Sequence, residues 1–467
     1  MTSLKSEIIE ATGAKFPPGL DIPSNFPNLI ATDSRSISEE QWFLPISGLN
    51  FDGHDYIEQA MAKASGFIYA SRSKDKVAPE LQDRGIEVDD TLRFFQTLAR
   101  LWRDRMGTKL VGITGSSGKT TAKEMTAHIL SQHSRTFHTS GSFNNEIGVP
   151  ISLCQLKPEH RFAVIEMGAR HEGDIKFLCE QANPDIAVLL NIGTAHIGEF
   201  GGAEILRRTK QEIFTSTRSD CLAIYPSDDQ IAGDVAKKHH DNTLGFGVKS
   251  GDVYVDELGF ESNKMKLMVN CSNGPFEVSP PGYHLAYPIN FAAAISVALA
   301  FGLEKDDIIR GINSFTGIDR RYRVYDTGKT IVIDDTYNAN PQSMKMGLGS
   351  ISKGFPDRKK IVFLGDMLEL GNSSQEEHQS VGRFCAAEVA PEVLVTIGSE
   401  GKHIAQGAID AGFPSPKIRQ FDFSDDVLPY MEELTKQGNL LYAKASNGIK
   451  LDKIIRAAMN HLNTPTD

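Results

Sequence analysis

Short apolar runs alternate with helical patterns through most of the chain. After a helical pattern over 91–106 come four buried strand candidates, at 110–114, 163–167, 186–191 and 221–225. Apolar strands that alternate with helices are typical of a mostly parallel sheet with helices on both faces. We therefore predict an α/β domain here, followed by a change of pattern: residues 253–278 predict a small antiparallel meander, and an alanine-rich helix is expected over 290–301.

The two ends of the chain show their own versions of this alternation. Strand candidates recur near the C-terminus at 330–333, 360–364, 393–397 and 440–443. The first 84 residues have shorter strand-like pieces, at 29–31 and 67–70, and a helical segment at 56–64. A chain of 467 residues exceeds one ordinary domain. We predict three domains, with limits 1–84, 85–316 and 317–467.

Composition narrows the class of protein. The net charge of −11 argues against a general nucleic-acid binder or a membrane-surface protein. No apolar run approaches a membrane span, and residues 1–15 have no long apolar stretch, so we expect no signal peptide. The cysteines are scattered and odd in number, which is typical of reduced thiols in a cytoplasmic protein.

The most informative stretch joins the strand candidate at 110–114 to a helical pattern. It reads Thr-Gly-Ser-Ser-Gly-Lys-Thr-Thr over 114–121. In the order strand, glycine-rich loop, Lys-Thr, helix, backbone N–H groups and a helix N-terminus can face phosphate oxygens. Lys119 supplies a positive charge and the Thr120 hydroxyl can bind Mg²⁺. The alternative is an ordinary turn, but Gly-Lys-Thr at a helix start has no packing rationale. The residues we expect to bind phosphate are Gly115, Ser116, Ser117, Gly118, Lys119, Thr120 and Thr121.

Three further polar residues of this domain are candidates for the site. Glu166 ends a strand candidate and, beside a phosphate loop, can hold Mg²⁺ with Thr120; a capping role is the alternative. His196 lies on a loop after the next strand, at the same predicted sheet edge, where a packing role is the alternative. Lys210 lies in a helical segment and by itself would be interpreted as a surface lysine.

Two polar segments complete the candidates. Asn144 and Asn145 form a pair whose amides both donate and accept hydrogen bonds, which suits a polar substrate; a capped turn is the alternative. Asp335 and Asp366 fall at the carboxyl ends of strands, where open α/β sheets bind ligands. For Asp335, which follows Asp334, we expect a ribose or metal contact, and a capping acid is the alternative.

Together these segments resemble the Mur ligase family, ATP-dependent amide-forming enzymes of peptidoglycan precursor synthesis. The resemblance covers nearly the whole chain. It rests on the segments 32–35 and 51–54, 114–121, 143–148, 335–341 and 365–371. One departure is clear: Lys-Ala-Ser-Asn over 444–447 stands where the family usually has Lys-Gly-Ser-Arg. The resemblance implies a small UDP-binding N-terminal domain, a central phosphate-loop domain with a parallel sheet, and a Rossmann-like C-terminal domain.

The resemblance also implies roles for particular residues. Lys119 would hold the β- and γ-phosphates of ATP, and Thr120 and Glu166 one Mg²⁺. His196 would lie near a second Mg²⁺ with Lys210, which is carbamylated in the family, and these residues with Asn144 and Asn145 make the expected catalytic set. The remaining implied contacts are adenine for Asn290, the γ-phosphate for Arg320, ATP ribose for Asp335 with Asn338 nearby, and the UDP-sugar for Asp33, Ser34, Arg35 and His54.

Within the family, the 143–148 and 335–341 segments resemble the member that adds a dipeptide. The reaction this implies joins D-alanyl-D-alanine to UDP-N-acetylmuramoyl-tripeptide through an acyl phosphate, with ATP and Mg²⁺. We expect a monomer. The rival hypotheses are a ligase of the same fold with another amine or acceptor, and a nucleotide-binding relative without ligase activity.

Overall fold

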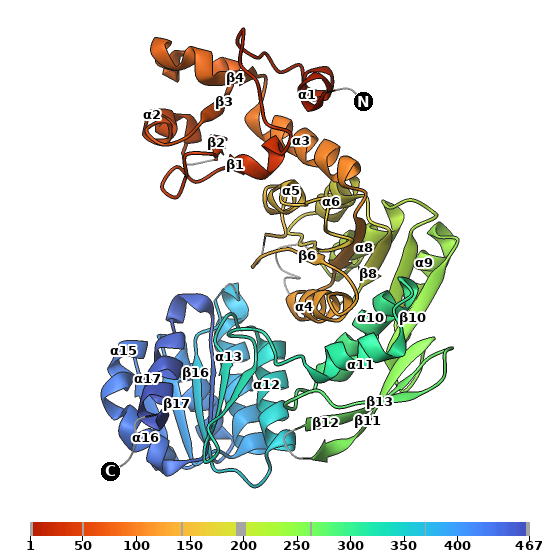
Figure 1. Ribbon diagram of the computed structural model, residues 1–467. Coiled ribbons are helices and arrows are strands. Elements are labelled where there is room, and N and C mark those ends of the chain that lie inside the picture. The colour runs from red at the N-terminus through yellow and green to blue at the C-terminus, as the bar shows by residue number, and fades with distance from the viewer. Residues whose placement is uncertain are drawn as a thin grey trace. The chain divides into compact units, whose positions relative to one another are not determined.

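The structure is a computed structural model that describes residues 3–48, 51–141, 143–192, 202–261, 264–368 and 370–463 (Figure 1). The chain divides into two compact units. The first holds residues 1–123 and 133–244, and the second holds 124–132 and 245–467. Each unit is described by itself.

The first unit begins with a small parallel sheet. Its strands lie in the order β1-β2-β3-β4, and every neighbouring pair is parallel. The bounds are β1 Ile30–Ala31, β2 Trp42–Phe43, β3 Gly66–Ala70 and β4 Gly85–Val88. The helices are α1 Leu4–Thr12 and α2 Ile57–Met61, and short 3₁₀ turns include η2 Gly53–Tyr56 and η3 Ser71–Lys76.

A long helix, α3 Thr91–Met106, leads into the central sheet and has the bounds that the sequence predicts. Asp90 caps its N-terminus by accepting from the Arg93 amide, and Gly107, with φ of 62°, ends it in the left-handed conformation. Its apolar face contributes Phe94, Phe95 and Leu98 to a buried core. Both the capping residues and the buried apolar face therefore explain why this segment forms a helix with these bounds.

The central sheet of the first unit is parallel, in the order β9-β8-β5-β7-β6. Its strands are β5 Lys109–Thr114, β6 Thr136–His138, β7 Phe162–Glu166, β8 Ile186–Leu189 and β9 Leu222–Pro226. The helices are α4 Lys119–Leu130, α5 Gly148–Cys154, α6 Asp174–Ala182, α8 Ala203–Thr215 and α9 Gln230–His239, and α4 crosses into the second unit. The carboxyl end of β5 thus leads directly into the glycine-rich loop and α4.

The second unit contains the predicted meander. β10 Thr243–Val248 enters this unit at Gly245 and pairs in parallel with β11 Val253–Glu261. β12 Lys264–Asn270 and β13 Phe276–Val278 continue antiparallel. The alanine-rich helix α10 runs over Tyr287–Ala300, a few residues earlier than predicted because Pro288 fits the first turn of a helix. α11 Lys305–Asn313 follows.

The C-terminal sheet has the order β14-β15-β19-β16-β17-β18, parallel except for β14. The strands are β14 Arg323–Asp326, β15 Ile331–Asp335, β16 Lys360–Gly365, β17 Val393–Ile397, β18 Ile418–Phe421 and β19 Leu440–Lys444. The helices are α12 Pro341–Gly354, α13 Ser374–Phe384, α14 Gly401–Asp410, α15 Ser424–Val427, α16 Met431–Gln437 and α17 Asp452–Asn463.

Two separate cores explain why these strands are apolar throughout. Ile331 and Ile333 pack on one face, with residues of α12, α13 and α14. Val332, between them, packs on the other face with α15, α16 and α17. Figure 1 shows α12 and α13 on one side of β16 and β17 and α15 to α17 on the other. A strand buried on both faces needs no alternation of polar residues, as the sequence predicted.

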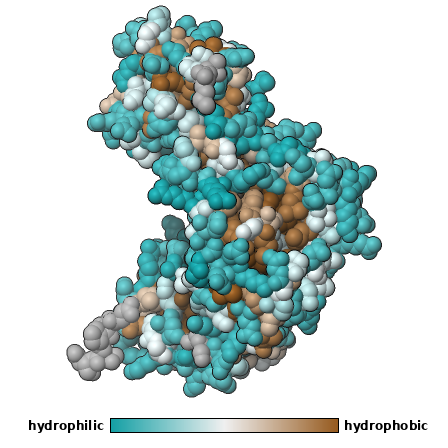
Figure 2. All heavy atoms as spheres, turned by 45° about the vertical axis from the view of Figure 1, so that its right-hand side comes forward, coloured by the Kyte–Doolittle hydropathy of each residue, from teal (hydrophilic) through white to brown (hydrophobic). Residues whose placement is uncertain are grey.

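Hydrophilic residues dominate the face of the molecule drawn in Figure 2, although an apolar area interrupts them. Large apolar side chains that are exposed include Phe143, Leu368 and Phe423. Among the described residues, no helix combines the length and the apolar character needed to cross a bilayer.

Candidate functional site

The glycine-rich loop joins β5 to α4 in the first unit. Gly118 has φ of 78°, which a residue with a side chain rarely adopts, so the tight turn before Lys119 requires glycine. The Lys119 amine donates to the Gly115 carbonyl at 2.9 Å. Among the described residues, the buried hydroxyl of Ser116 has no hydrogen-bond partner. An unpaired buried hydroxyl is costly, which suits a loop that receives phosphate oxygens.

Asn191 braces this loop and was missed by the sequence reasoning. Its side-chain oxygen accepts the Ser117 amide at 3.0 Å, and its side-chain nitrogen donates to the Ser117 carbonyl at 3.0 Å. Its backbone carbonyl accepts the Ser116 amide at 3.1 Å. The available signal was its position at the end of a predicted buried strand, the same signal that drew attention to Glu166.

Thr120, Glu166 and Asn144 form one hydrogen-bonded group. The Thr120 hydroxyl donates to Glu166 Oε2 at 2.8 Å, and the Asn144 amide donates to Glu166 Oε1 at 2.8 Å. Glu166 is only 2% exposed. The structure therefore brings together two predicted Mg²⁺ ligands and one predicted catalytic asparagine.

The contacts of Asn145 differ from those of Asn144. Its side-chain oxygen accepts the Gly148 amide at 2.9 Å, at the start of α5. This contact lies within the turn before α5, as in the alternative that the sequence left open for the pair, and the catalytic role of Asn145 stays a prediction. Asn144 is thus the member of the pair that contacts the Glu166 carboxylate.

Lys210 lies on α8 and is almost fully buried, so the interpretation as a surface lysine is wrong. Burial and the nearby Lys119 cation lower the pKa of Lys210 to about 7. Asp174 and Glu212 oppose this shift. Glu212 accepts the amides of Gly173 and Lys176, at 2.7 and 2.9 Å, and so ties α8 to the start of α6.

The predicted metal-site residue His196 lies outside the described residues. Within the described part of the chain, His, Cys, Asp and Glu side chains form no group of three or more that could hold a metal ion. Thr120 and Glu166 offer a hydroxyl and a carboxylate oxygen, the hard donors that Mg²⁺ prefers. The donor chemistry of this pair therefore fits Mg²⁺.

Asp335 lies in the second unit, at the carboxyl end of β15, and is 7% exposed. Its Oδ2 accepts from the Lys444 amine at 2.9 Å and from the Tyr442 hydroxyl at 3.1 Å. Lys444 also donates to the Asn338 carbonyl at 3.0 Å. Burial raises the pKa of the Asp335 carboxyl, and Lys444 opposes that shift. Asn338 is exposed on the following turn, and Asn340 caps α12.

Arg320 lies in the same unit, in the segment before β14. Its guanidinium donates to the Thr336 carbonyl at 2.9 Å and to the Asn447 side-chain oxygen at 2.9 Å. Asn447 is one of two residues, with Ala445, that depart from the family pattern in this segment, and it contacts Arg320 directly. The predicted adenine contact, Asn290, is buried on α10.

Asp366 directly follows β16, and its side chain contacts the start of a helix. Its Oδ1 accepts the amides of Glu400 and Gly401, at 3.0 and 2.8 Å, at the start of α14. A carboxylate at the carboxyl end of a strand can therefore bind backbone amides of the protein instead of a ligand.

The predicted UDP-sugar residues lie in the small sheet domain of the first unit. Arg35 makes a two-pronged contact with Asp33, at 2.9 and 2.8 Å, and its side chain is 82% exposed. This contact lowers the pKa of Asp33 to about 2. The Ser34 hydroxyl contacts Gln59 at 3.4 Å. A cation held in place but open to solvent can meet an anionic ligand.

His54, the fourth of these residues, is enclosed. Its side chain is 0% exposed, and its Nε2 accepts the Ala70 amide at 3.0 Å. Nδ1 therefore carries the proton and donates to Asp52 at 2.7 Å. Asp52 also accepts from Lys76 at 2.7 Å. Both ring nitrogens are used inside the domain, which favours a structural role over contact with a sugar.

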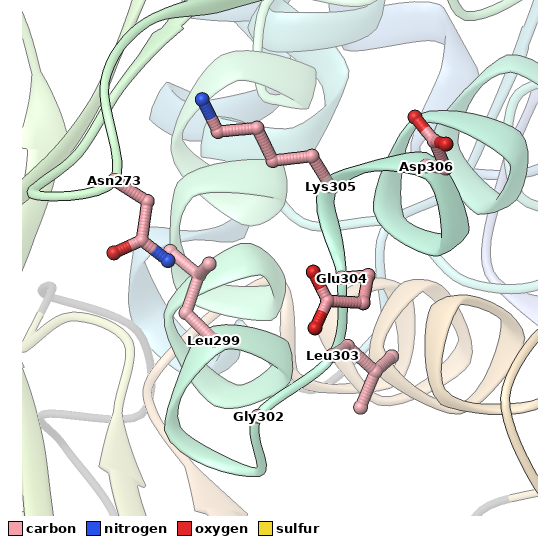
Figure 3. Close-up of a pocket in the computed structure, with 7 residues that line it drawn as sticks. All are labelled: Asn273, Leu299, Gly302, Leu303, Glu304, Lys305 and Asp306. Atoms are coloured by element: carbon pink, nitrogen blue, oxygen red, sulfur yellow. The ribbon is translucent and has the colours of Figure 1, made fainter.

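A pocket in the second unit lies at the turn between α10 and α11 (Figure 3). Lys305 extends away from the Asp306 carboxylate, and Glu304 lies between the two helices. None of the predicted ATP residues line this pocket, and its two acidic side chains outnumber its one cation.

The comparisons with known proteins agree with this arrangement. Three family models match the chain: "Mur ligase family, catalytic domain" over 28–103, "Mur ligase middle domain" over 113–298 and "Mur ligase, glutamate ligase domain" over 320–447. The UDP-N-acetylmuramoyl-tripeptide–D-alanyl-D-alanine ligase of Bacillus subtilis (strain 168) is 32% identical over 432 residues, which cover 91% of this chain and 92% of that protein.

Solved structures extend the likeness to three dimensions. MurF from Acinetobacter baumannii has a TM-score of 0.85 at 31% identity, covering 97% of this chain and 98% of that one. MurF ligase from Thermotoga maritima in complex with ADP has a TM-score of 0.81 at 27% identity, covering 94% and 99%. This chain belongs to the Mur ligase family, and the predicted family and fold class are confirmed.

Proposed function

We propose that this protein is an ATP-dependent ligase that joins D-alanyl-D-alanine to UDP-N-acetylmuramoyl-tripeptide in peptidoglycan precursor synthesis. One observation carries the proposal: the glycine-rich loop, Lys119 and the Thr120–Glu166 contact occur in a chain that matches MurF structures over nearly its full length. The ADP complex of the Thermotoga maritima relative supports the use of ATP.

The reaction has two steps. The terminal carboxylate of the tripeptide attacks the γ-phosphorus of ATP, the bond from that phosphorus to the β,γ-bridging oxygen breaks, and ADP leaves with that oxygen. The dipeptide amine then attacks the carbonyl of the acyl phosphate, inorganic phosphate leaves, and the amine loses a proton. Carboxylate and triphosphate repel each other, so the protein must supply positive charge and fixed geometry.

The first unit supplies that charge at the loop. Lys119 would contact the phosphates, and the amides of the loop and of the α4 N-terminus would add partial positive charge. Asn191 and Gly118 hold the loop in shape before ATP arrives. Preorganised donors avoid a reorganisation cost during the reaction.

Thr120 and Glu166 would hold one Mg²⁺, which supplies charge neutralisation at the phosphate oxygens when bound. Asn144 fixes the Glu166 carboxylate from its other oxygen. His196 and Lys210 belong to the proposed second metal site. A lysine with a pKa of about 7 has a substantial neutral fraction at neutral pH, and only the neutral amine forms a carbamate.

The second unit would contribute the remaining ATP contacts: Asn290 to adenine, Arg320 to the γ-phosphate, and Asp335 with Asn338 to the ribose. Asp335 uses Oδ2 for Lys444 and Tyr442, and these contacts fix the orientation of its carboxylate. In the first unit, Asp33, Ser34 and Arg35 would meet the UDP-sugar. The domain limits 1–84, 85–316 and 317–467, a monomeric state and a cytoplasmic location belong to the same proposal.

The test is phosphate release from ATP and Mg²⁺ with UDP-N-acetylmuramoyl-tripeptide, with and without D-alanyl-D-alanine. Release that requires both substrates, together with a product heavier by one dipeptide, is the expected result. Lys119→Ala is the negative control. Turnover with another amine would identify a different ligase of this fold, and nucleotide binding without turnover would identify an inactive relative; either result would overturn the proposal.

A further inference from the structure

Lys123 is a buried cation that the mechanism above does not use. It lies on α4 one turn after Thr120 and is 0% exposed. Its amine donates to the backbone carbonyls of Thr139 and Gly141, at 2.5 and 3.3 Å. Lysine is almost never fully buried without partners, because removing an ammonium group from water is costly.

The two carbonyls belong to the connection that carries Asn144. Thr139 follows β6, donates its amide to the Val164 carbonyl at 3.1 Å, and accepts the Glu166 amide on its hydroxyl at 3.3 Å. Gly141 precedes Asn144 by three positions, and the Asn144 carbonyl accepts the Gly168 amide at 2.7 Å. Lys123 therefore ties this connection to the helix that carries Thr120.

Glu166 is at the centre of these contacts. Thr120 on α4 holds one carboxylate oxygen, Asn144 holds the other, and Thr139 holds the backbone amide. Lys123 bridges α4 and the residues after β6, which are the two sides of this arrangement. A methionine has nearly the same length and would fill the same space without a buried charge, so packing alone does not account for a lysine.

We propose that Lys123 is a positioning residue for ligation: it sets where Asn144 holds the Glu166 carboxylate relative to Thr120. The inference rests on the proposed function, but part of its test does not require ligase activity. Loss of Lys123 would leave two carbonyls unpaired and let the Asn144 segment shift, and a displacement of about 1 Å at a reacting centre can cost about 100-fold in rate.

The first experiment compares Lys123→Met with wild type and with Lys109→Met as a control for the loss of a lysine. Lys109 lies at the far end of β5 and forms an exposed ion pair with Asp185. We expect Lys123→Met to lower kcat about 100-fold while KM for ATP stays within about threefold. Calorimetry should show that Lys123→Met binds ADP without Mg²⁺ as tightly as wild type does. Adding Mg²⁺ should raise the ADP affinity of wild type but not that of the variant. Lys109→Met should behave as wild type in each assay.

A double-mutant cycle with Asn144→Ala tests the route of the effect. If both residues act on the Glu166 carboxylate, the double variant should lose about 100-fold, close to each single variant, instead of the product of about 10,000-fold. Full multiplication of the two losses would overturn the proposal. So would a kcat for Lys123→Met within twofold of wild type.

A second variant covers the case in which Lys123→Met fails to fold. Lys123→Gln keeps one amide donor for the carbonyls, and an intermediate loss of kcat with normal thermal melting supports the proposal. Normal kcat, or loss of ADP affinity without Mg²⁺, overturns it in favour of a structural role. If wild type binds ADP with Mg²⁺ but forms no product, the proposed function fails while the ADP measurements still test Lys123.

Discussion

Buried polar groups are treated differently in two regions, the glycine-rich loop of the first unit and the end of β15 in the second unit. The regions differ in whether these groups have partners within the protein. At the loop, the Ser116 hydroxyl is buried with no hydrogen-bond partner among the described residues. At β15, the buried carboxylate of Asp335 is held by the Lys444 amine and the Tyr442 hydroxyl. One site leaves a polar group for a ligand, and the other supplies the partners from its own sheet.

The difference shows how substitution should affect each region. A ligand-binding group without an internal partner does not stabilise the fold, so its removal should lower activity without lowering stability. A buried charge that is paired internally is part of the folded structure, and removing its partner leaves an uncompensated charge. The same distinction separates Arg35 from His54 in the small sheet domain.

The largest expected effect is on activity in the first unit. Lys210→Ala removes the only group at this position that can form a carbamate, and we expect ligation to fall by about 1000-fold or more. Steady-state phosphate release measures the loss, and thermal melting checks that the protein still folds. Added bicarbonate should not restore activity, because the variant has no amine. Near-normal activity would show that the carbamate assignment is wrong.

The next largest effect is on stability, and it tests the difference between the end of β15 and the glycine-rich loop. Lys444→Met leaves the Asp335 carboxylate buried without its cation, and we expect the free energy of unfolding to fall by about 3–5 kcal/mol. Lys119→Met, at the loop, is the matched control, with an expected change within about 0.5 kcal/mol. Urea denaturation followed by circular dichroism measures both variants. Equal stability losses would contradict the distinction between the two sites.

A smaller pair of effects is expected in the small sheet domain. His54→Ala removes hydrogen bonds to the Ala70 amide and to Asp52, so we expect a loss of about 1–3 kcal/mol in stability. Arg35→Ala should leave stability unchanged and raise KM for the UDP-linked substrate, because its side chain is exposed. Melting curves and substrate titrations separate the two outcomes. A normal melting temperature with a raised KM for His54→Ala would restore it as a ligand contact.

Regular elements were the easiest part of the structure to predict from the sequence. Helix α3 and strand β17 have their predicted bounds because capping, amphipathic periodicity and continuous burial are local or repeated signals. The phosphate loop was found for the same reason: its chemistry is contained in consecutive residues. Lys119 and Thr120 required no knowledge of the rest of the fold.

Contacts between distant segments could not be predicted in this way. Asn191 reaches the loop from the segment after β8, 74 positions from Ser117 along the chain. Lys123 and Lys444 look like ordinary helix and strand lysines until the fold shows that they are buried. Asn145 and Asp366 have the residue types of ligand contacts, and in the structure their side-chain oxygens accept backbone amides near the starts of α5 and α14. Residue type indicates possible chemistry, and only three-dimensional neighbours decide which use is made of it.

The smallest effect concerns pH at Lys210. Its pKa in the folded protein is lowered to about 7 from 10.5, so the amine is protonated below pH 7 and neutral above it. Between these two values the unfolded chain binds a proton that the folded protein does not, so this group makes stability rise with pH there.

At a fixed bicarbonate concentration, the neutral amine and bicarbonate condense to carbamate and water. The ¹³C signal of the carbamate should therefore rise about tenfold from about pH 6 to about pH 8, whereas an ordinary lysine would show the rise near its unperturbed pKa. Lys210→Met, which has no amine, is the control and should give no signal at this position. A rise confined to strongly alkaline pH would contradict the conclusion that burial and Lys119 lower the pKa of Lys210. It would also weaken the contrast between the first-unit site, whose groups are available for reaction, and the end of β15, whose charged groups pair with each other.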